Sequence, residues 1–317
     1  MQNKKHSPFL HVLLFFVTVA TTLIAGAEWI TGKPGPFDIS ELKVALPYTV
    51  SILFILGVHE FGHYFAARFH KVDVTLPYFI PFPPLAGFLN FGTMGAVIKT
   101  RSSVVSNKVM FDIGVAGPIA GFFAALIVLI YGYLNLPDVN YLLAIHPDYF
   151  SPDYGHDAIV LKFGSSLLFE FFNYIFNTPD NFIPPMTEIY HYPYLIAGWF
   201  GLFVTSMNMI PVGQLDGGHV VFGMFGEKKH EIIASIFMII LLIFGFTGTL
   251  DALLGLGLNF GWTGWLFWAL LLKFVIKIKH PPVYITQPLS KTRMLFGYFS
   301  LFILFVTFSP SPFIIQF

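Results

Sequence analysis

The sequence predicts an all-α polytopic membrane protein with about seven transmembrane helices and a membrane-embedded re-entrant β-hairpin. Its composition is the first reason: 56% of the 317 residues are hydrophobic and 11% are charged, whereas soluble domains carry about 25% charged residues. The second reason is a series of apolar stretches close to the ~20 residues that cross a bilayer. The third is an apolar segment at 76–98 whose Pro and Gly residues are incompatible with a regular helix.

Seven stretches have the length and the apolar character of a membrane-spanning helix. They are 9–27, 44–66, 109–134, 194–211, 232–250, 262–279 and 294–309. Seven spans place the termini on opposite sides of the membrane. Lys33, Lys43 and Lys162 then fall on one side, and the remaining Lys and Arg residues of the 17 in the chain fall on the side of the N-terminus. Because cytoplasmic loops carry the excess of Lys and Arg, we expect the N-terminus in the cytoplasm.

Two segments between the spans need a different structure. Residues 76–98 are apolar but not helical, and such backbone lies at membrane depth only where protein or a water-filled cavity satisfies its polar groups. We therefore expect a re-entrant hairpin there. In the long outer loop, 135–192, the stretch 163–176 is rich in Phe and Leu but too short to span, which predicts a helix lying on the membrane surface.

We divide the chain into three parts on this basis. They are a first helix with its outer loop (1–43), a central core that includes the re-entrant segment and the long outer loop (44–225), and C-terminal transmembrane helices (226–317). We read the first apolar stretch as a retained span, because it runs on without a signal-peptidase site. Since no transit peptide is evident, we expect a bacterial cytoplasmic membrane.

The residues His59-Glu60-Phe61-Gly62-His63 form an H-E-x-x-H motif near the end of the second apolar stretch. On a helix, His59 and His63 lie one turn apart on the same face and present two nitrogen ligands to a metal. Glu60 lies beside them and can act as general base toward water at that metal, as in zinc hydrolases. The plainer role for Glu60, satisfying a neighbouring donor, is less favoured in an intact motif.

A third ligand is expected, because hydrolytic zinc sites have three protein ligands and one open position. The chain has no Cys, so this ligand is a His or a carboxylate. Asp216 follows the fourth apolar stretch on the same side as the motif, and an ionisable group there is costly unless paired or metal-bound. The alternative is that Asp216 caps a helix in its Gly-rich turn. Asn208 can stabilise an oxyanion or hold a substrate backbone, or simply hydrogen-bond between helices.

Other polar and small residues in the third stretch have structural interpretations. Gly114, Gly117 and Gly121 give a small-residue face for close helix packing. We expect Asp112 to stabilise the positive N-terminal end of its helix. His219 is expected to be a solvated cytoplasmic histidine rather than a partner of the metal site.

Three motifs occur in the order HEFGH (59–63), GVAGPIAGF (114–122) and NMIPVGQLDGGH (208–219), on separate apolar stretches. With them the chain resembles the site-2 protease family of intramembrane zinc metalloproteases, over roughly residues 45–225. The segments at 92–98 and 163–172 are similar to the branch of plant-chloroplast EGY-type proteins and their bacterial relatives.

The resemblance implies proteolysis of membrane proteins in or near their transmembrane segments, with one Zn²⁺ per chain. His59, His63 and Asp216 would be the zinc ligands, Glu60 the catalytic glutamate, and Asn208 a substrate or transition-state contact. The hairpin would meet an unwound substrate. The outer loop of 58 residues leaves no room for a PDZ domain, and we expect no nucleotide-sensing CBS pair.

Two other functions remain as alternatives. One is a zinc or cation transporter, although the outer halves of the spans have almost no ionisable residues to continue a polar path. The other is a non-catalytic homologue that binds membrane helices, which the intact Glu60 disfavours. A nucleic-acid partner has no support, because no basic block is present. The expected partners are transmembrane protein substrates and the lipid bilayer, and no motif specifies the oligomeric state.

Overall fold

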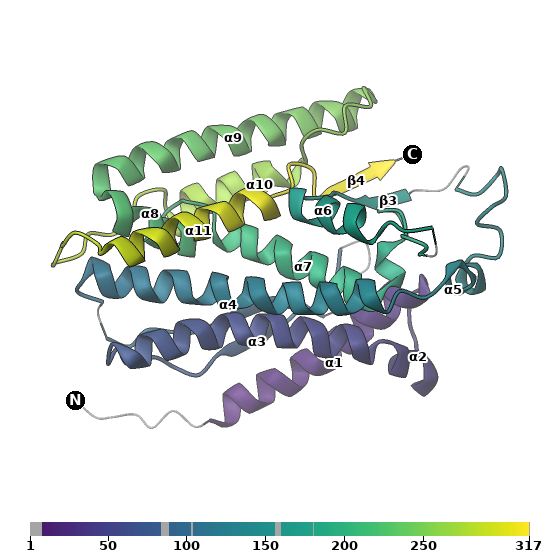
Figure 1. Ribbon diagram of the computed structural model, residues 1–317, viewed down its shortest axis with the longest axis horizontal. Helices are drawn as coiled ribbons and strands as arrows, with labels where there is room; N and C mark the ends of the chain where they lie inside the picture. The colour runs from purple at the N-terminus through teal and green to yellow at the C-terminus, as the bar shows by residue number, and fades with distance from the viewer. Residues whose placement is uncertain (1–7, 84–88, 103, 156–159, 180, 317) are drawn as a thin grey trace.

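The computed structural model describes residues 8–83, 89–102, 104–155, 160–179 and 181–316. Most of this part of the chain is helical (Figure 1). The helices are α1 (Phe9–Thr31), α2 (Ile39–Val44), α3 (Leu46–Phe69), α4 (Asn107–Leu134), α5 (Val139–Ile145), α6 (Leu167–Phe176), α7 (Pro193–Asn208), α8 (Asp216–Phe225), α9 (Glu227–Leu254), α10 (Gly264–Leu271) and α11 (Lys291–Thr307), with a 3₁₀ turn η1 (Ile189–His191) and a π-helical turn η2 (Leu272–Ile276). The strands are β1 (Tyr78–Pro81), β2 (Thr93–Val97), β3 (Val160–Phe163) and β4 (Phe313–Gln316).

Four helices in the described part of the chain are long and apolar enough to cross a membrane, namely α1, α3, α4 and α9. The chain is therefore an integral membrane protein. Each of the other three predicted spans also contains a helix, but these helices are shorter: α7 has 16 residues, α10 has eight followed by the five of η2, and α11 has 17. In Figure 1, α3, α4, α9 and α11 run roughly along a common direction.

The ends of these helices follow ordinary local rules. Helix α1 ends at Gly32, whose φ of 68° lies in the left-handed region that glycine adopts without strain. Helix α2 begins with a capping box, in which Asp38 accepts from the N–H of Glu41 and the Glu41 carboxylate accepts from the N–H of Asp38. Pro47 lies in the first turn of α3, where its missing N–H costs nothing.

The segment predicted to form a hairpin contains the antiparallel pair β1 and β2, in which Tyr78 is opposite Val97 and Phe79 is opposite Ala96. Residues 84–88 of this segment lie outside the described residues. The segment after them is attached to α1 and α3: the Tyr48 hydroxyl donates to the carbonyl of Phe91 at 2.9 Å, and the Trp29 indole donates to the carbonyl of Asn90 at 2.7 Å. These contacts hold β2 against the helices.

A second two-stranded sheet pairs β3 of the outer loop with β4 near the C-terminus, in antiparallel register from Val160 opposite Gln316 to Phe163 opposite Phe313. This sheet was not predicted from the sequence, because its two short strands are 150 residues apart and neither alternates clearly. The helix expected at 163–176 is found as α6, and it is amphipathic. Phe169 and Phe172 are buried, whereas Tyr174 is exposed.

The main hydrophobic core lies where α3, α4 and α7 pack together. Aromatic rings fill its centre, and the rings of Phe91 and Phe200 stack with their centroids 4.0 Å apart. Asp112 has a different role from the one predicted. It lies in the second turn of α4 and accepts two hydrogen bonds from the Arg293 guanidinium, at 2.8 and 2.7 Å, and one from His70 at 2.8 Å. It therefore connects α3, α4 and α11 rather than stabilising one helix end.

Candidate metal centre

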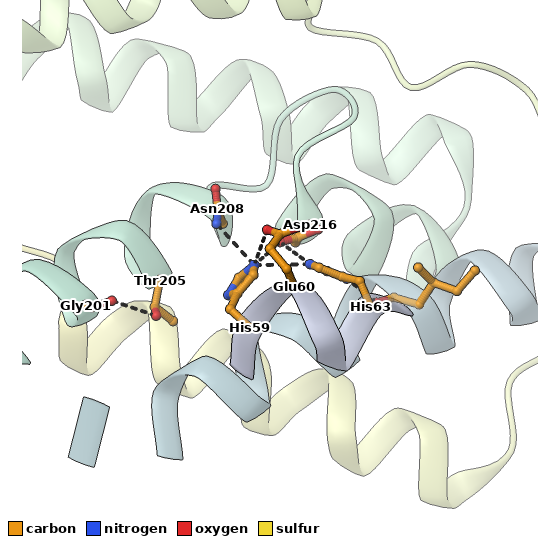
Figure 2. Close-up of polar contacts among 8 residues, drawn as sticks. His59, Glu60, His63, Gly201, Thr205, Asn208 and Asp216 are labelled. Carbon is orange, nitrogen blue, oxygen red and sulfur yellow. Dashed lines mark hydrogen bonds and ion pairs between the residues drawn. The ribbon is translucent and has the colours of Figure 1, made fainter. Parts of the chain in front are cut away.

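The two histidines of the H-E-x-x-H motif lie on the buried face of α3. Their exposed fractions are 4% for His59 and 6% for His63, and their Nε2 atoms are 3.1 Å apart (Figure 2). The Nδ1 atom of His63 is 2.7 Å from the carbonyl oxygen of Ile113 on α4. Because a carbonyl only accepts, Nδ1 carries the proton and Nε2 keeps its lone pair. This is the tautomer in which an imidazole binds a metal through Nε2.

Asp216 is the first residue of α8, and its carboxylate points at the two imidazoles. Its Oδ2 atom is 3.4 Å from His59 Nε2 and 3.3 Å from His63 Nε2 (Figure 2). The Gly-rich sequence allows the chain to turn sharply here: Gly213 adopts a φ of 57°, and a Cβ on Gly217 would overlap the carbonyl of Met209. Asp216 makes no capping bond of its own helix, since Leu215 is the N-cap residue and no side-chain cap is formed.

The three atoms fit a zinc ion. With bonds of about 2.0–2.1 Å in tetrahedral geometry, the ligand atoms of one zinc are about 3.3 Å apart. The three separations here are 3.1, 3.3 and 3.4 Å. The lone pair of His63 Nε2 and the carboxylate oxygen of Asp216 repel one another at this distance unless a cation or a proton lies between them. The donor set of two imidazoles and a carboxylate suits zinc.

Glu60 and Asn208 lie next to this cluster. The Glu60 side chain is buried, with Oε1 3.9 Å from His59 Nε2, and its carboxylate lies near the backbone N–H of Ile98, the residue after β2. Asn208 is the last residue of α7, and its side-chain Nδ2 is 3.3 Å from His59 Nε2 (Figure 2). The structure thus brings all five predicted site residues together, from α3, α7 and α8.

Glycines of α4 make room for the histidines. A Cβ on Gly117 would lie 2.1 Å from His63 Nε2, and a Cβ on Gly121 would lie 2.9 Å from His59 Nδ1. Gly62 in turn packs against the backbone of Ala116. The small-residue face predicted on this helix therefore contacts the two candidate ligands, His59 and His63. Sequence reasoning identified the glycines but not this contact, because the facing residue of another helix cannot be read from one helix's pattern.

The surroundings of His219 differ from the prediction. Its Nδ1 is 2.8 Å from His280 Nε2, and His280 and the neighbouring His230 are buried. The two imidazoles of His219 and His280 share one hydrogen bond on the α8 side of the cluster, so His219 is not simply a solvated side chain. Nothing in the local sequence around His280 signals this contact.

A largely buried His-His-Asp cluster beside a glutamate, with both histidines on a helix that is apolar enough to span a bilayer, has the features of a membrane-embedded metallohydrolase centre. The chain belongs to peptidase family M50, whose model matches residues 47–246. The matched region includes all five site residues.

Three relatives illustrate the similarity. The chain is 35% identical over 234 residues to the probable zinc metalloprotease EGY1, chloroplastic, of Oryza sativa subsp. japonica, covering 72% of this chain and 34% of the relative. The chain is 36% identical over 189 residues to the protein of that name from Arabidopsis thaliana, covering 59% of this chain and 31% of the relative. The chain is 28% identical over 280 residues to the probable zinc metalloprotease EGY2, chloroplastic, of Arabidopsis thaliana, covering 87% of this chain and 44% of the relative. The chain thus spans 31–44% of the length of these relatives, and no solved structure matches it.

Proposed function

We propose that this protein is an intramembrane zinc metalloprotease that hydrolyses peptide bonds in or near the transmembrane segments of membrane proteins. His59, His63 and Asp216 would hold one zinc at this site, and Glu60 would be the general base. The observation that carries the proposal is the convergence of the three ligand atoms, 3.1–3.4 Å apart, beside Glu60. Membership of peptidase family M50 supports it.

Zinc, when bound, supplies a Lewis acid that polarises the scissile carbonyl and makes water a stronger acid. A carboxylate oxygen of Glu60 takes the proton from the attacking water and later delivers it to the leaving amine nitrogen. The proton thus travels from water to amine through one side chain. The Asn208 amide, which lies within 3.3 Å of His59 Nε2, is placed to donate to the oxyanion that forms at the carbonyl.

The hairpin is proposed to hold the substrate. A helical substrate hides its carbonyls in its own hydrogen bonds, so it must be unwound before hydrolysis. In the described part of the chain β2 pairs only with β1, so its other edge can accept an added strand. Met94 on β2 is 69% exposed, and the end of β2 lies at Glu60. We propose that the hairpin is re-entrant and membrane-embedded.

For the placement in the membrane we propose seven spans, with the N-terminus and the metal centre toward the cytoplasm and 44–225 as the catalytic core. The asymmetry of Lys and Arg supports this orientation. The helices α3, α4, α9 and α11 lie roughly along one axis, and α3 runs opposite to α4, which supports several passes through the bilayer. The names of the plant relatives place those proteins in chloroplasts, which is at odds with the bacterial cytoplasmic membrane expected from the sequence.

The decisive experiment compares wild type with Glu60→Gln, both purified in detergent with matched zinc content, on a panel of single-span membrane proteins. We expect cleavage by the wild type only, because glutamine keeps the size of the side chain but cannot accept the proton. Equal cleavage by both would remove Glu60 from the mechanism. If neither cleaves any substrate while zinc passes through the protein into liposomes, the transporter is the correct alternative.

The hairpin is tested separately. Gly95 has a φ of 98°, which proline cannot adopt, so Gly95→Pro would distort the strand itself. Met94→Lys is cleaner, because the side chain is exposed and a lysine on an edge strand discourages pairing. We expect at least tenfold slower cleavage with unchanged zinc content, and normal cleavage by the control Met94→Leu. Normal cleavage by Met94→Lys would exclude β2 as the docking edge.

A further inference from the structure

A second cluster of imidazole and carboxylate groups lies in the outer loop, outside the proposed active site. His146 follows the last residue of α5, and Glu188 and His191 lie just before α7. The Nε2 atoms of His146 and His191 are 2.9 Å apart, and Glu188 Oε2 lies 3.6 Å from His191 Nε2 and 3.9 Å from His146 Nε2. His191 is fully buried and the Glu188 side chain is 5% exposed.

Two of the facing atoms in the cluster, His191 Nε2 and Glu188 Oε2, have lone pairs that are directed at each other. His191 Nδ1 is 2.8 Å from the carbonyl of Ile30 on α1, so it donates there and Nε2 is unprotonated. Glu188 Oε1 accepts from the hydroxyl of Tyr154 at 3.1 Å, whereas Oε2 is buried without a hydrogen-bond partner among the described residues. A buried carboxylate oxygen that faces an imidazole lone pair needs a cation or a proton between them.

We propose that His146, Glu188 and His191 form a second metal site, independent of the proposed active site, that binds a divalent transition-metal ion such as Zn²⁺. Two imidazoles and one carboxylate favour such an ion over Ca²⁺ or Mg²⁺, which prefer oxygen ligands. Water completes the coordination on the side of His146, whose side chain is 28% exposed.

The same arrangement occurs at the H-E-x-x-H pair. There His63 donates through Nδ1 to a backbone carbonyl at 2.7 Å, and two Nε2 atoms approach to 3.1 Å. In the outer cluster the corresponding distances are 2.8 and 2.9 Å. Carbonyl groups that fix the tautomer of a ligating histidine are a regular part of metal sites.

The site connects three parts of the outer face. His146 belongs to the end of α5, Glu188 and His191 precede α7, and the carbonyl of Ile30 belongs to the end of α1. The 16 residues of α7 separate this cluster from Asn208 by about 24 Å at 1.5 Å per residue. A metal here would therefore stabilise the outer loop without touching the reacting groups.

A proton is the competing occupant. Burial raises the pKa of the Glu188 carboxyl above its usual range, so a protonated Glu188 can also relieve the contact. The two possibilities differ in metal content, which is the quantity to measure.

The test uses the full-length protein in detergent, loaded with Zn²⁺, freed of excess metal and analysed for zinc per chain. The background variant His59→Ala/His63→Ala removes the first site, so any remaining zinc reports the second. We expect about two zinc ions per wild-type chain, one in the background variant, and none when His146→Ala is added. His11→Ala in the same background is the control for loss of a histidine outside both clusters, and it should keep one zinc.

Folding is followed in each variant by thermal unfolding with and without Zn²⁺. Zinc should raise the Tm of the background variant, and this rise should disappear on adding His146→Ala or the isosteric Glu188→Gln. A folded background variant that holds no zinc would overturn the proposal, as would a zinc-induced rise that survives both changes. Neither result would affect the proposed protease, because its zinc is removed from the measurement.

Discussion

Gly117→Ala is the sharpest test of how the metal centre is built. Gly117 lies on α4, and a Cβ added there would be 2.1 Å from His63 Nε2, the atom proposed to bind zinc. The substitution leaves every proposed ligand and Glu60 unchanged. It also favours the helix, because alanine is a better helix former than glycine by roughly 1 kcal/mol. Any loss of metal must therefore come from the methyl group at the site.

The size of the displacement follows from the contact distance. Non-bonded carbon and nitrogen atoms settle near 3.4 Å or beyond, so the imidazole or helix α4 must move by about 1.3 Å. Zinc sites tolerate deviations of only about 0.2 Å from ideal bond lengths. The hydrogen bond from His63 to the Ile113 carbonyl, now 2.7 Å, would be lost or lengthened by the same movement. We expect zinc affinity to fall by at least a hundredfold and cleavage to fall with it.

The assay measures the zinc content per chain after competition with a chelator, and thermal unfolding reports whether each variant is folded. Gly57→Ala is the matched control: Gly57 lies on α3, two residues before His59, yet a Cβ there meets only the Phe79 ring at an ordinary 3.8 Å. It should keep zinc and unfold at the same or a higher temperature. A folded Gly117→Ala protein with wild-type zinc affinity would show that His63 Nε2 does not point at the metal as described.

Two further predictions concern the supports of the site. Gly217→Ala should abolish zinc binding, because its Cβ would overlap the carbonyl of Met209 and open the turn that carries Asp216; zinc content measures this, and retained zinc would contradict it. Arg293→Ala should destabilise the protein by about 1–2 kcal/mol, since it removes a bidentate, partly exposed ion pair with Asp112. We expect a lower Tm with normal zinc content, and a smaller decrease in Tm for Arg293→Lys. An unchanged Tm in Arg293→Ala would show that this ion pair does not stabilise the packing of α11 on α4.

Most of the helical framework could be predicted from hydropathy, because a bilayer demands long apolar helices whatever their neighbours are. The predicted stretches 9–27 and 109–134 correspond to α1 and α4, which start or end within a few residues of them. The pairing of β3 with β4 could not be predicted in this way. It depends on which segments the packed helices bring together, and two strands of four residues carry little pattern of their own.

The convergence of the candidate ligands was predictable to a similar degree, and for a clear reason. His59 and His63 share a helix, so their relation is fixed by the helical repeat. Asp216 required a different inference, from the cost of a charge near the membrane. The cluster of His146, Glu188 and His191 was missed because His146 lies 45 residues before His191 in a loop, where no repeat or burial pattern indicates which polar side chains will meet.

The surroundings of the cluster of His59, His63 and Asp216 determine from which side a substrate can reach it. On the α4 side, Gly117 and Gly121 leave no room even for a methyl group next to the histidines, so no peptide can enter there. On the hairpin side, Glu60 lies at the end of β2, and Met94 is largely exposed. Substitutions at the α4 glycines should therefore change metal binding first, and substitutions on β2 should change substrate cleavage while metal binding is kept. A β2 variant that loses zinc, or an α4 variant that cleaves slowly with its zinc intact, would contradict this division of roles.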